Sequence, residues 1–296
     1  MPLPTVPLAG HHVGRLGYGA MQLPGPGVWG PPADRNAAIA VLRAAVDHGV
    51  THIDTAGFYG PHVADELLRE ALHPYPADLL IASKVGVVRG PDRSWLPAAS
   101  PSALVEQVHD NLRRLGLDRL DLVYLRVGGD GLLDHDPTPF EESWGTLADL
   151  ADKGDIGHLA LSGITPGHLP RAEDIAPVAA VQSRFSLFDR SGAAVLAACA
   201  AHAWEPLPFV PYFPLGGAGA QRRHPRLTAI ADRVEASAEQ VALAWLLAQH
   251  PAILAIPGTR DAAHLAQNMA ADEVRHRLTG LDLAELDAIA IATADA

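Results

Sequence analysis

Three apolar stretches of the sequence each end in a side chain that can carry charge. Asp54 ends VTHID, Lys84 ends LLIASK and Arg126 ends LDLVYLR, while Tyr59 follows Asp54 by five residues. Buried ions are costly unless they are paired, so we expect Lys84 to pair with Asp54 where these ends meet. A cation beside Tyr59 would lower the pKa of its phenol and make it a usable proton donor and acceptor. The alternative is a simple ion pair between strand ends, with Tyr59 an ordinary loop residue.

The elements that must bring these side chains together alternate along the chain, with short β-rich apolar runs followed by longer amphipathic runs. This alternation is typical of βα units, which build a parallel sheet with helices outside it. The predicted strands span 15–20, 50–54, 79–84, 120–125, 156–161, 179–182, 207–211 and 253–256. The predicted helices span 34–48, 63–72, 102–115, 140–153, 191–202, 236–249, 261–270 and 281–292. Asp34 and Ser102 are expected to cap two of these helices through side-chain oxygens.

Eight evenly spaced units favour a closed (β/α)8 barrel, the TIM barrel of the α/β class, over an open doubly wound sheet. No G-x-G-x-x-G turn follows the first predicted strand, as an open dinucleotide-binding sheet would require. No linker-like segment interrupts the pattern, so we expect residues 1–296 to form a single domain. In such barrels the working groups lie at the carboxyl ends of the strands, where Asp54, Lys84 and Arg126 are predicted.

Composition argues against several classes of partner. The chain has 296 residues, of which 48% are hydrophobic and 19% charged, and its formal net charge is -12. An acidic surface repels nucleic acid and anionic membranes, and no window reaches the ~18 apolar residues of a membrane span. The N-terminal segment lacks the features of a signal peptide, so we expect a cytoplasmic protein.

The other reactive side chains indicate no further chemistry. Cys199 lies in the alanine-rich run AAVLAACAAHA, so we expect a buried helix residue and not a nucleophile. Histidines such as His11, His12 and His73 do not have the spacing of metal ligands. We therefore expect no metal.

Seven blocks, in this order, resemble the successive signatures of the aldo-keto reductases: HIDTAGFYG, ASKVG, LGLDRLDLVYL, HLALSGIT, AAVQSRFSLFDR, VPYFPLGG and IPGTRDAAHLAQN. They cover nearly the whole chain. Five further segments, GFYGPHV, ALHPYP, WLPAASP, VHDNLRRLGLD and FVPYFPLGG, are similar to the bacterial NADPH-dependent pyridoxal reductase branch. The resemblance implies reduction of a small carbonyl compound with NADP(H), with Tyr59 as proton donor and Lys84 and Asp54 as its charged partners.

Arg126 departs from the pattern of the family, which usually has a histidine at this position. An arginine stays cationic and donates several hydrogen bonds, but it cannot relay a proton as histidine does. Arg126 could orient the carbonyl or an adjacent anionic oxygen, and its charge would lower the pKa of Tyr59 further. The alternative is a structural cation that pairs with an acidic residue of a loop.

The resemblance also implies a nicotinamide site. Ser162 and Gln182 would hold the carboxamide, and Tyr212 would stack on the ring. Gly163 stands where the family usually has asparagine, so one amide contact is missing. The other positions of this part of the cofactor site are Gly19, Ala20, Met21, Asp54, Phe213, Pro214, Leu215, Gly216 and Gly217.

The rest of the cofactor would lie after the eighth strand, where phosphate sites of these barrels are expected. By resemblance, Thr259 and Arg260 would contact the 2′-phosphate, and Arg260 favours NADP over NAD because a phosphate suits a planar cation. Gly258 replaces a lysine of many members, so the expected preference for NADPH is modest. The remaining positions are His264, where an arginine is often found, and Gln267 and Asn268, which would reach the adenine.

The substrate pocket should be walled by Trp29, Phe58, Trp95, Tyr59 and Arg126, with His62 a weaker candidate. Each tryptophan could instead be a lid or packing residue. Two other functions stay open: non-redox acid–base chemistry, as in a dehydratase or cyclase, and a nucleotide-binding regulatory subunit. The sequence leaves open the oligomeric state and whether the substrate is pyridoxal or another aldehyde, ketone or imine, including one of secondary metabolism.

Overall fold

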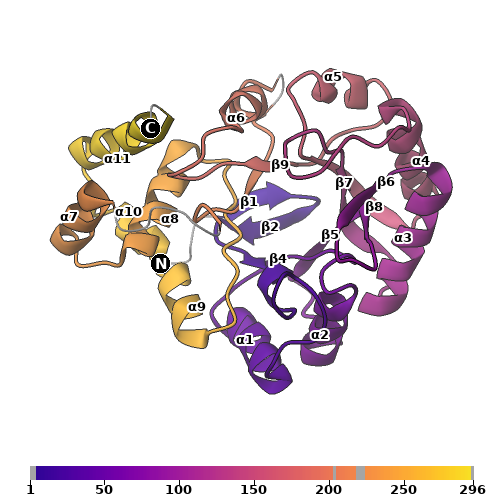
Figure 1. Ribbon diagram of the computed structural model, residues 1–296, viewed down its shortest axis with the longest axis horizontal. Helices are drawn as coiled ribbons and strands as arrows, with labels where there is room; N and C mark the ends of the chain where they lie inside the picture. The colour runs from indigo at the N-terminus through magenta and orange to yellow at the C-terminus, as the bar shows by residue number, and fades with distance from the viewer. Residues whose placement is uncertain (1–4, 203–204, 218–223, 295–296) are drawn as a thin grey trace.

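A computed structural model describes residues 5–202, 205–217 and 224–294. Its main feature is a curled sheet in which neighbouring strands run parallel in the order β3, β4, β5, β7, β8, β9 and β10 (Figure 1). These strands span Tyr18–Gly19, His52–Asp54, Leu80–Arg89, Leu120–Arg126, Ile156–Ser162, Val181–Arg184 and Phe209–Tyr212. The seven strands fall within or overlap the first seven predicted ones.

The segment 252–255 closes this sheet into a ring. Ile253 forms a parallel bridge with Phe209 of β10, and Ala255 forms one with Leu16, just before β3. The Leu254 amide donates to the Phe209 carbonyl at 2.9 Å, and the Gly17 amide donates to the Ala255 carbonyl at 2.8 Å. The arrangement is consistent with the predicted (β/α)8 barrel, although the eighth predicted strand is reduced to isolated bridges.

Helices surround the ring, as Figure 1 shows. They are α1 (Arg35–Asp47), α2 (Val63–Leu72), α3 (Pro101–Leu115), α4 (Phe140–Lys153), α5 (His168–Glu173), α6 (Ala193–Ala200), α7 (Pro225–Arg233), α8 (Ala238–Gln249), α9 (Ala262–Met269), α10 (Ala271–Arg275) and α11 (Gly280–Ala294), with a short 3-10 turn at Ala20–Gln22. The helices α5, α7 and α10 were not predicted. No helix within the described ranges is both long and apolar enough to cross a membrane.

One of the two predicted helix caps is present. Asp34 precedes α1 and its side chain accepts a hydrogen bond from the Ala37 amide. The prediction for Ser102 is wrong, because α3 already begins at Pro101, with Ser100 as its cap residue. A proline is well suited to the first helical position, since it has no amide hydrogen to leave unpaired there.

Two hairpins lie outside the predicted pattern. The strands β1 (Thr5–Leu8) and β2 (His11–Gly14) pair in antiparallel fashion, and Leu8 and Val13 pack against the buried barrel residues Leu80 and Leu122. Because Leu80 and Leu122 lie near the amino ends of their strands, this hairpin covers that end of the barrel. The second hairpin forms where β5 runs on past the sheet and pairs with β6 (Trp95–Ala98).

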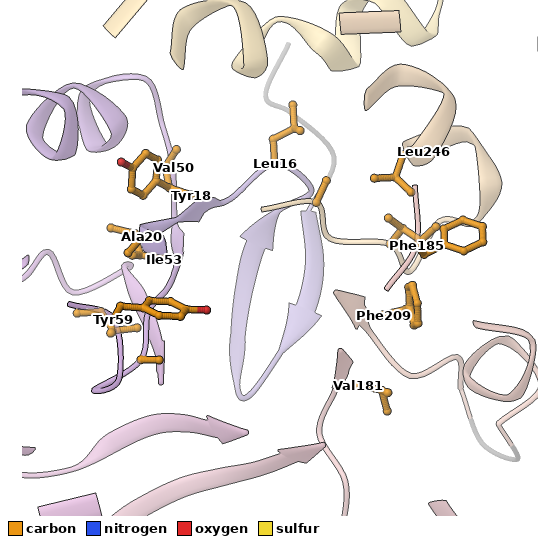
Figure 2. Packing of buried hydrophobic residues seen from close by; sticks show 14 of the residues in the cluster. Leu16, Tyr18, Ala20, Val50, Ile53, Tyr59, Val181, Phe185, Phe209 and Leu246 are labelled. Carbon is orange, nitrogen blue, oxygen red and sulfur yellow. The ribbon is translucent and has the colours of Figure 1, made fainter. Parts of the chain in front are cut away.

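The core between strands and helices fixes the strands in place. Figure 2 shows Phe185, Phe209 and Leu246 near one another, and Tyr18, Val50 and Ile53 together elsewhere in the same cluster. The Phe185 ring also stacks on Trp245 with 5.8 Å between centroids. Close packing of this kind leaves little freedom to the strand ends, which therefore hold their polar side chains in defined positions.

Candidate active site

Lys84 binds both partners that the sequence suggested for it. Its Nζ forms an ion pair with Asp54 and donates to the Tyr59 hydroxyl at 3.0 Å and to the Thr55 carbonyl at 3.0 Å. The strands β4 and β5 are neighbours in the barrel, and their register places Asp54 opposite Ala82, two residues before Lys84. The Lys84 side chain is only 5% exposed. A phenol, an ammonium and a carboxylate thus form one buried cluster.

The pKa of Tyr59 departs from the sequence-based expectation. Burial raises this pKa by more than the charges of Lys84 and Arg126 lower it, so the net shift is upward. The expectation of a lowered pKa is therefore wrong, although each cation acts in the expected direction. The hydroxyl keeps its proton at neutral pH, and this is the form that a proton donor requires.

Lys84 stays protonated as well. Burial alone would lower its pKa, but Asp54 and the Tyr59 hydroxyl favour the ammonium form, and the pKa is raised overall. Asp54 is fixed from a third strand, because Gln182 on β9 donates to its second carboxylate oxygen at 2.6 Å. Ser162 is paired in register with Gln182 across β8 and β9. Four barrel strands therefore contribute to the cluster and its surroundings.

Arg126 lies beside this cluster and is held by a loop residue. Its Nη2 donates to Asp130 at 2.7 Å, and the Tyr212 hydroxyl donates to the same carboxylate oxygen at 2.5 Å. The Arg126 guanidinium lies 5.5 Å from the centroid of the Tyr212 ring. Arg126 is thus paired with an acidic loop residue, as the alternative interpretation expected. Its side chain also lines the cavity described next.

A cavity of about 180 Å³ is lined in part by Tyr59 and Lys84. Its walls are mostly apolar and are formed by Met21, Phe58, Tyr59, Lys84, Val87, Trp95, Arg126, Leu132, Leu133, Ser162, Gln182, Tyr212 and Phe213. The rings of Phe58 and Trp95 meet edge to face at 5.7 Å, and Phe58 meets Tyr59 in the same way at 5.2 Å. An apolar cleft with a few polar groups at one end is typical of a site for a small ligand.

Two predicted pocket residues lie elsewhere. Trp29 is not among the residues that line the cavity, and its ring instead lies 5.1 Å from the Arg89 guanidinium. His62 is also outside the lining, with its Nδ1 3.0 Å from Asp110. Both belong to loops whose course the spacing of residues in the sequence does not determine.

Gly163 has a steric reason for being glycine. A Cβ at this position would overlap the Arg126 guanidinium, and the backbone φ of +67° favours glycine independently. The present position of the Arg126 guanidinium therefore excludes a side chain at position 163. Arginine occupies the space that a side chain at 163 would need.

Gly258 and Gly19 face each other where the ring closes. A Cβ on Gly258 would overlap the Gly19 carbonyl oxygen, and a Cβ on Gly19 would lie 2.6 Å from the Ile256 carbonyl oxygen. Ala20, the next residue, is fully buried. Close backbone contact thus explains why position 258 carries no long side chain.

The loop after β10 contains the predicted PLGG segment. Phe213, Gly216 and Gly217 all have positive φ, and the Gly216 amide donates to the Phe213 carbonyl at 2.7 Å. Pro214 and Leu215 complete this turn, in which Phe213 reaches the cavity. Residues 218–223 lie outside the described ranges.

The segment after the eighth strand leads into α9. Thr259 is buried, its hydroxyl accepts from the Asp261 amide at 3.0 Å, and Tyr18 donates to its carbonyl oxygen at 2.5 Å. Asp261 caps α9 by accepting from the His264 amide. Along this segment Arg260, His264 and Gln267 are exposed and Asn268 is buried. These residues lie outside the lining of the cavity.

Sequence reasoning missed Asp130 and Arg89. Asp130 follows Arg126 in a glycine-rich turn, and an acidic residue so close to a strand-end arginine was the available signal.

Arg89 extends from the unpredicted end of β5, and its guanidinium lies 4.0 Å from the centroid of the Trp95 ring. It also donates to the Val28 carbonyl at 2.8 Å and to the Arg93 carbonyl at 2.9 Å. Arg89 therefore connects the β5–β6 hairpin to the loop that contains Val28.

Comparison with known proteins assigns the family. The model of the aldo/keto reductase family matches residues 15–291. The chain belongs to the aldo/keto reductase family. It is 49% identical over 273 residues to a pyridoxine 4-dehydrogenase of Escherichia coli K12, covering 91% of this chain and 93% of that protein. This aldo/keto reductase is thus an oxidoreductase.

Solved structures agree with this assignment. A Klebsiella pneumoniae aldo-keto reductase in complex with NADPH superposes with a TM-score of 0.81 at 30% identity, covering 98% of this chain and 95% of that one. A K. pneumoniae aldo/keto reductase in complex with NADP and acetate gives 0.79 at 27% identity, with coverage of 97% and 95%. Within the described ranges of the present chain, no three His, Cys, Asp or Glu side chains are grouped so that they could hold a metal ion.

Proposed function

We propose that this aldo/keto reductase reduces a small aldehyde or ketone with NADPH and that Tyr59 protonates the carbonyl oxygen. The observation that carries the proposal is the buried contact of Lys84 with both Tyr59 and Asp54, since Tyr59 and Lys84 line the cavity. Lys84, with its own charge balanced by Asp54, stabilises the negative charge that Tyr59 acquires when it gives up its proton. Tyr59 and Lys84 are both buried, which limits the contact of water with this transfer.

The residues around the cavity fit NADP(H). Ser162 and Gln182 offer a hydroxyl and an amide for the carboxamide, and the Tyr212 ring offers a flat face for the nicotinamide. Gly19, Ala20, Met21 and the turn 213–217 are assigned to the same cofactor. NADPH supplies the hydride when bound.

The 2′-phosphate and adenine of the cofactor are assigned to the segment that begins at Gly258. Its residues for this role are Thr259, Arg260, His264, Gln267 and Asn268. The exposed guanidinium of Arg260 suits a phosphate group.

Pyridoxal is the substrate that we propose first, because of the 49% identity to a pyridoxine 4-dehydrogenase. Phe58 and Trp95 would hold its ring, and Arg126 would contact a polar group next to the aldehyde. Another aromatic aldehyde of similar size would meet the same walls. No specific observation favours a dehydratase, a cyclase or a regulatory subunit, whereas the contacts of Lys84 with Tyr59 and Asp54 suit reduction.

The proposal is tested by following the near-ultraviolet absorbance of NADPH with pyridoxal and a panel of aldehydes. Tyr59→Phe removes the proton donor and should lower kcat by at least about 100-fold while NADPH still binds. Tyr75→Phe is the matched control, because the Tyr75 hydroxyl donates to the Leu115 carbonyl instead, and it should leave kcat within about twofold of wild type. An active Tyr59→Phe variant, or a wild type that consumes no NADPH with any substrate, would refute the proposal.

We further propose that the described chain is one (β/α)8 domain, since the ring of strands is closed by residues 252–255. We also propose a cytoplasmic location. The chain has a single cysteine and so cannot form an internal disulfide, which is compatible with a reducing environment. This residue, Cys199, is fully buried on α6, and burial raises its pKa to about 12. The acidic net charge of -12 supports a small-molecule partner and not nucleic acid or membrane.

A further inference from the structure

Asp130 balances a charge that would otherwise face the cavity. It lies in the loop between β7 and α4, and its side chain is 19% exposed. One carboxylate oxygen accepts from both Arg126 and Tyr212, and the other accepts from the Leu132 amide at 3.2 Å. These contacts fix the Asp130 carboxylate between the Arg126 guanidinium and the Tyr212 hydroxyl.

The Asp130 carboxyl is ionised at neutral pH. Burial would raise its pKa, but the Arg126 charge and the hydrogen bond from Tyr212 outweigh burial, and the pKa is lowered. Lys84 and Arg126 are the charged residues in the cavity wall, and each has a carboxylate partner, Asp54 or Asp130. The charges at the cavity are thus compensated in pairs.

The remaining wall suits an uncharged ring. Phe58, Trp95, Leu132 and Leu133 present apolar surface. An anionic ligand would have to shed its hydration without meeting an uncompensated cation in return.

We propose that Asp130 is a specificity-determining residue that neutralises Arg126 and so selects uncharged aromatic carbonyl compounds over anionic ones of the same shape. The inference rests on the proposed function and names the substrate class of that site. Arg126 then orients the substrate by hydrogen bonding, and does not recruit an anion by charge.

The test uses Asp130→Asn, which removes the charge while keeping a side-chain oxygen for Tyr212. The probes are 4-formylbenzamide and 4-formylbenzoate, which have nearly the same shape and differ in charge. We expect the wild type to favour the amide in kcat/KM by at least about tenfold, and Asp130→Asn to shift this ratio toward the carboxylate by at least about tenfold. The double variant Asp130→Asn/Arg126→Gln should restore the preference for the amide, because the unmasked cation is gone.

Asp134→Asn is the control, since Asp134 is an exposed carboxylate on the same loop. It should leave the ratio within about twofold of wild type, because its charge is solvated. Binding of benzamide and benzoate, followed by tryptophan fluorescence with NADP bound, gives the same comparison without turnover. It should show the same order of preference and the same shift.

The outcomes separate the two claims. Loss of the proposed function appears as no NADPH consumption with any aldehyde, and the binding ratios then still decide about Asp130. A wild type that binds or reduces the anion at least as well as the amide overturns the inference. So does a wild type that binds neither probe, or an Asp130→Asn variant whose ratios stay unchanged in both assays.

Discussion

The Lys84 ammonium and the Tyr59 hydroxyl are 3.0 Å apart, and the same ammonium is paired with Asp54. This contact joins a strand end to the loop that follows the neighbouring strand. It brings the proton-bearing phenol and the charge that can stabilise its anion into one hydrogen bond. The properties of the site depend on how this buried pair is maintained.

Replacing Lys84 tests that dependence most directly. Lys84→Met should lower kcat by at least about 100-fold, because Tyr59 would have no cation to stabilise its anion. It should also destabilise the fold by about 3–5 kcal/mol, since Asp54 would remain buried without its partner. Single-turnover kinetics and urea unfolding measure the two effects. Lys153→Met, at an exposed position of α4, is the control and should change neither; an active Lys84→Met enzyme would contradict the assignment.

The pH profile of reduction should be flat on its alkaline side. The pKa of Tyr59 is raised above its ordinary value of 10.0, so the donor form persists through pH 9 and is lost only as pH rises beyond that range. Arginine does not titrate there either. The measurement is kcat/KM for reduction between pH 6 and about 9. A decline with a midpoint below about pH 9 would show that another group is the acid.

Replacing Arg126 by the histidine that is usual in the family gives a second test of the pH profile. Arg126→His should introduce a new limb near the ordinary histidine pKa of about 6.5, since imidazole loses its charge there. A profile that stays flat in this variant would mean that position 126 does not touch the reacting groups.

Arg89 is expected to shape the pocket without touching the chemistry. Arg89→Met should raise KM for an aromatic aldehyde by roughly threefold to tenfold, because Trp95 loses the cation that packs against its ring. The dissociation constant of NADPH should be unchanged. Arg93→Met is the matched control, since its guanidinium lies 5.8 Å from the Trp29 ring and does not stack on Trp95. An equal effect on KM in both variants would remove the special role of Arg89.

Asp65 should make the stability of the protein depend on pH. This carboxyl is fully buried, accepts from the Thr55 hydroxyl at 2.7 Å, and has its pKa raised from 3.8 to about 7, mainly by burial. The folded state therefore holds a proton that the unfolded state releases, and stability falls as pH rises from about 4 to about 7. Asp65→Asn should flatten this dependence and raise stability at pH 8 by about 1–3 kcal/mol in urea unfolding. A variant that is less stable than wild type at pH 8 would contradict the sign.

The sequence predicts the positions of residues on the barrel strands better than those of residues on the loops. The proximity of Asp54, Lys84 and Arg126 could be predicted, because parallel strands of even spacing place their carboxyl ends at one face, although β5 continues past Lys84 to Arg89. The direction of the Tyr59 pKa could not, since it depends on how completely walls from distant loops exclude water. Asp130 was missed for a related reason, as loop paths follow from tertiary contacts and carry no periodic signal. Arg89 was missed because it lies on the extension of β5 that pairs with the unpredicted strand β6.

Trp29 illustrates the same limit in the opposite direction. A tryptophan in a loop near the site is a reasonable candidate for the substrate wall, but the Trp29 ring packs on Arg89 and is not part of the lining. The Gly163 departure was visible in the sequence, whereas its cause required coordinates, because only the position of the Arg126 guanidinium shows what fills the space.

That steric relation yields the last prediction. Gly163→Ala should displace the Arg126 guanidinium, because the new methyl group would occupy its space and the positive φ already disfavours alanine. The loss in kcat/KM should therefore resemble that of Arg126→Met. The double variant Gly163→Ala/Arg126→Met should be no worse than the poorer single variant, since the alanine then has no guanidinium to displace. Gly145→Ala, on α4 with open space around its Cβ position, is the control and should leave activity unchanged. Independent, additive losses would show that positions 126 and 163 are not coupled, and the paired departures would then need separate explanations.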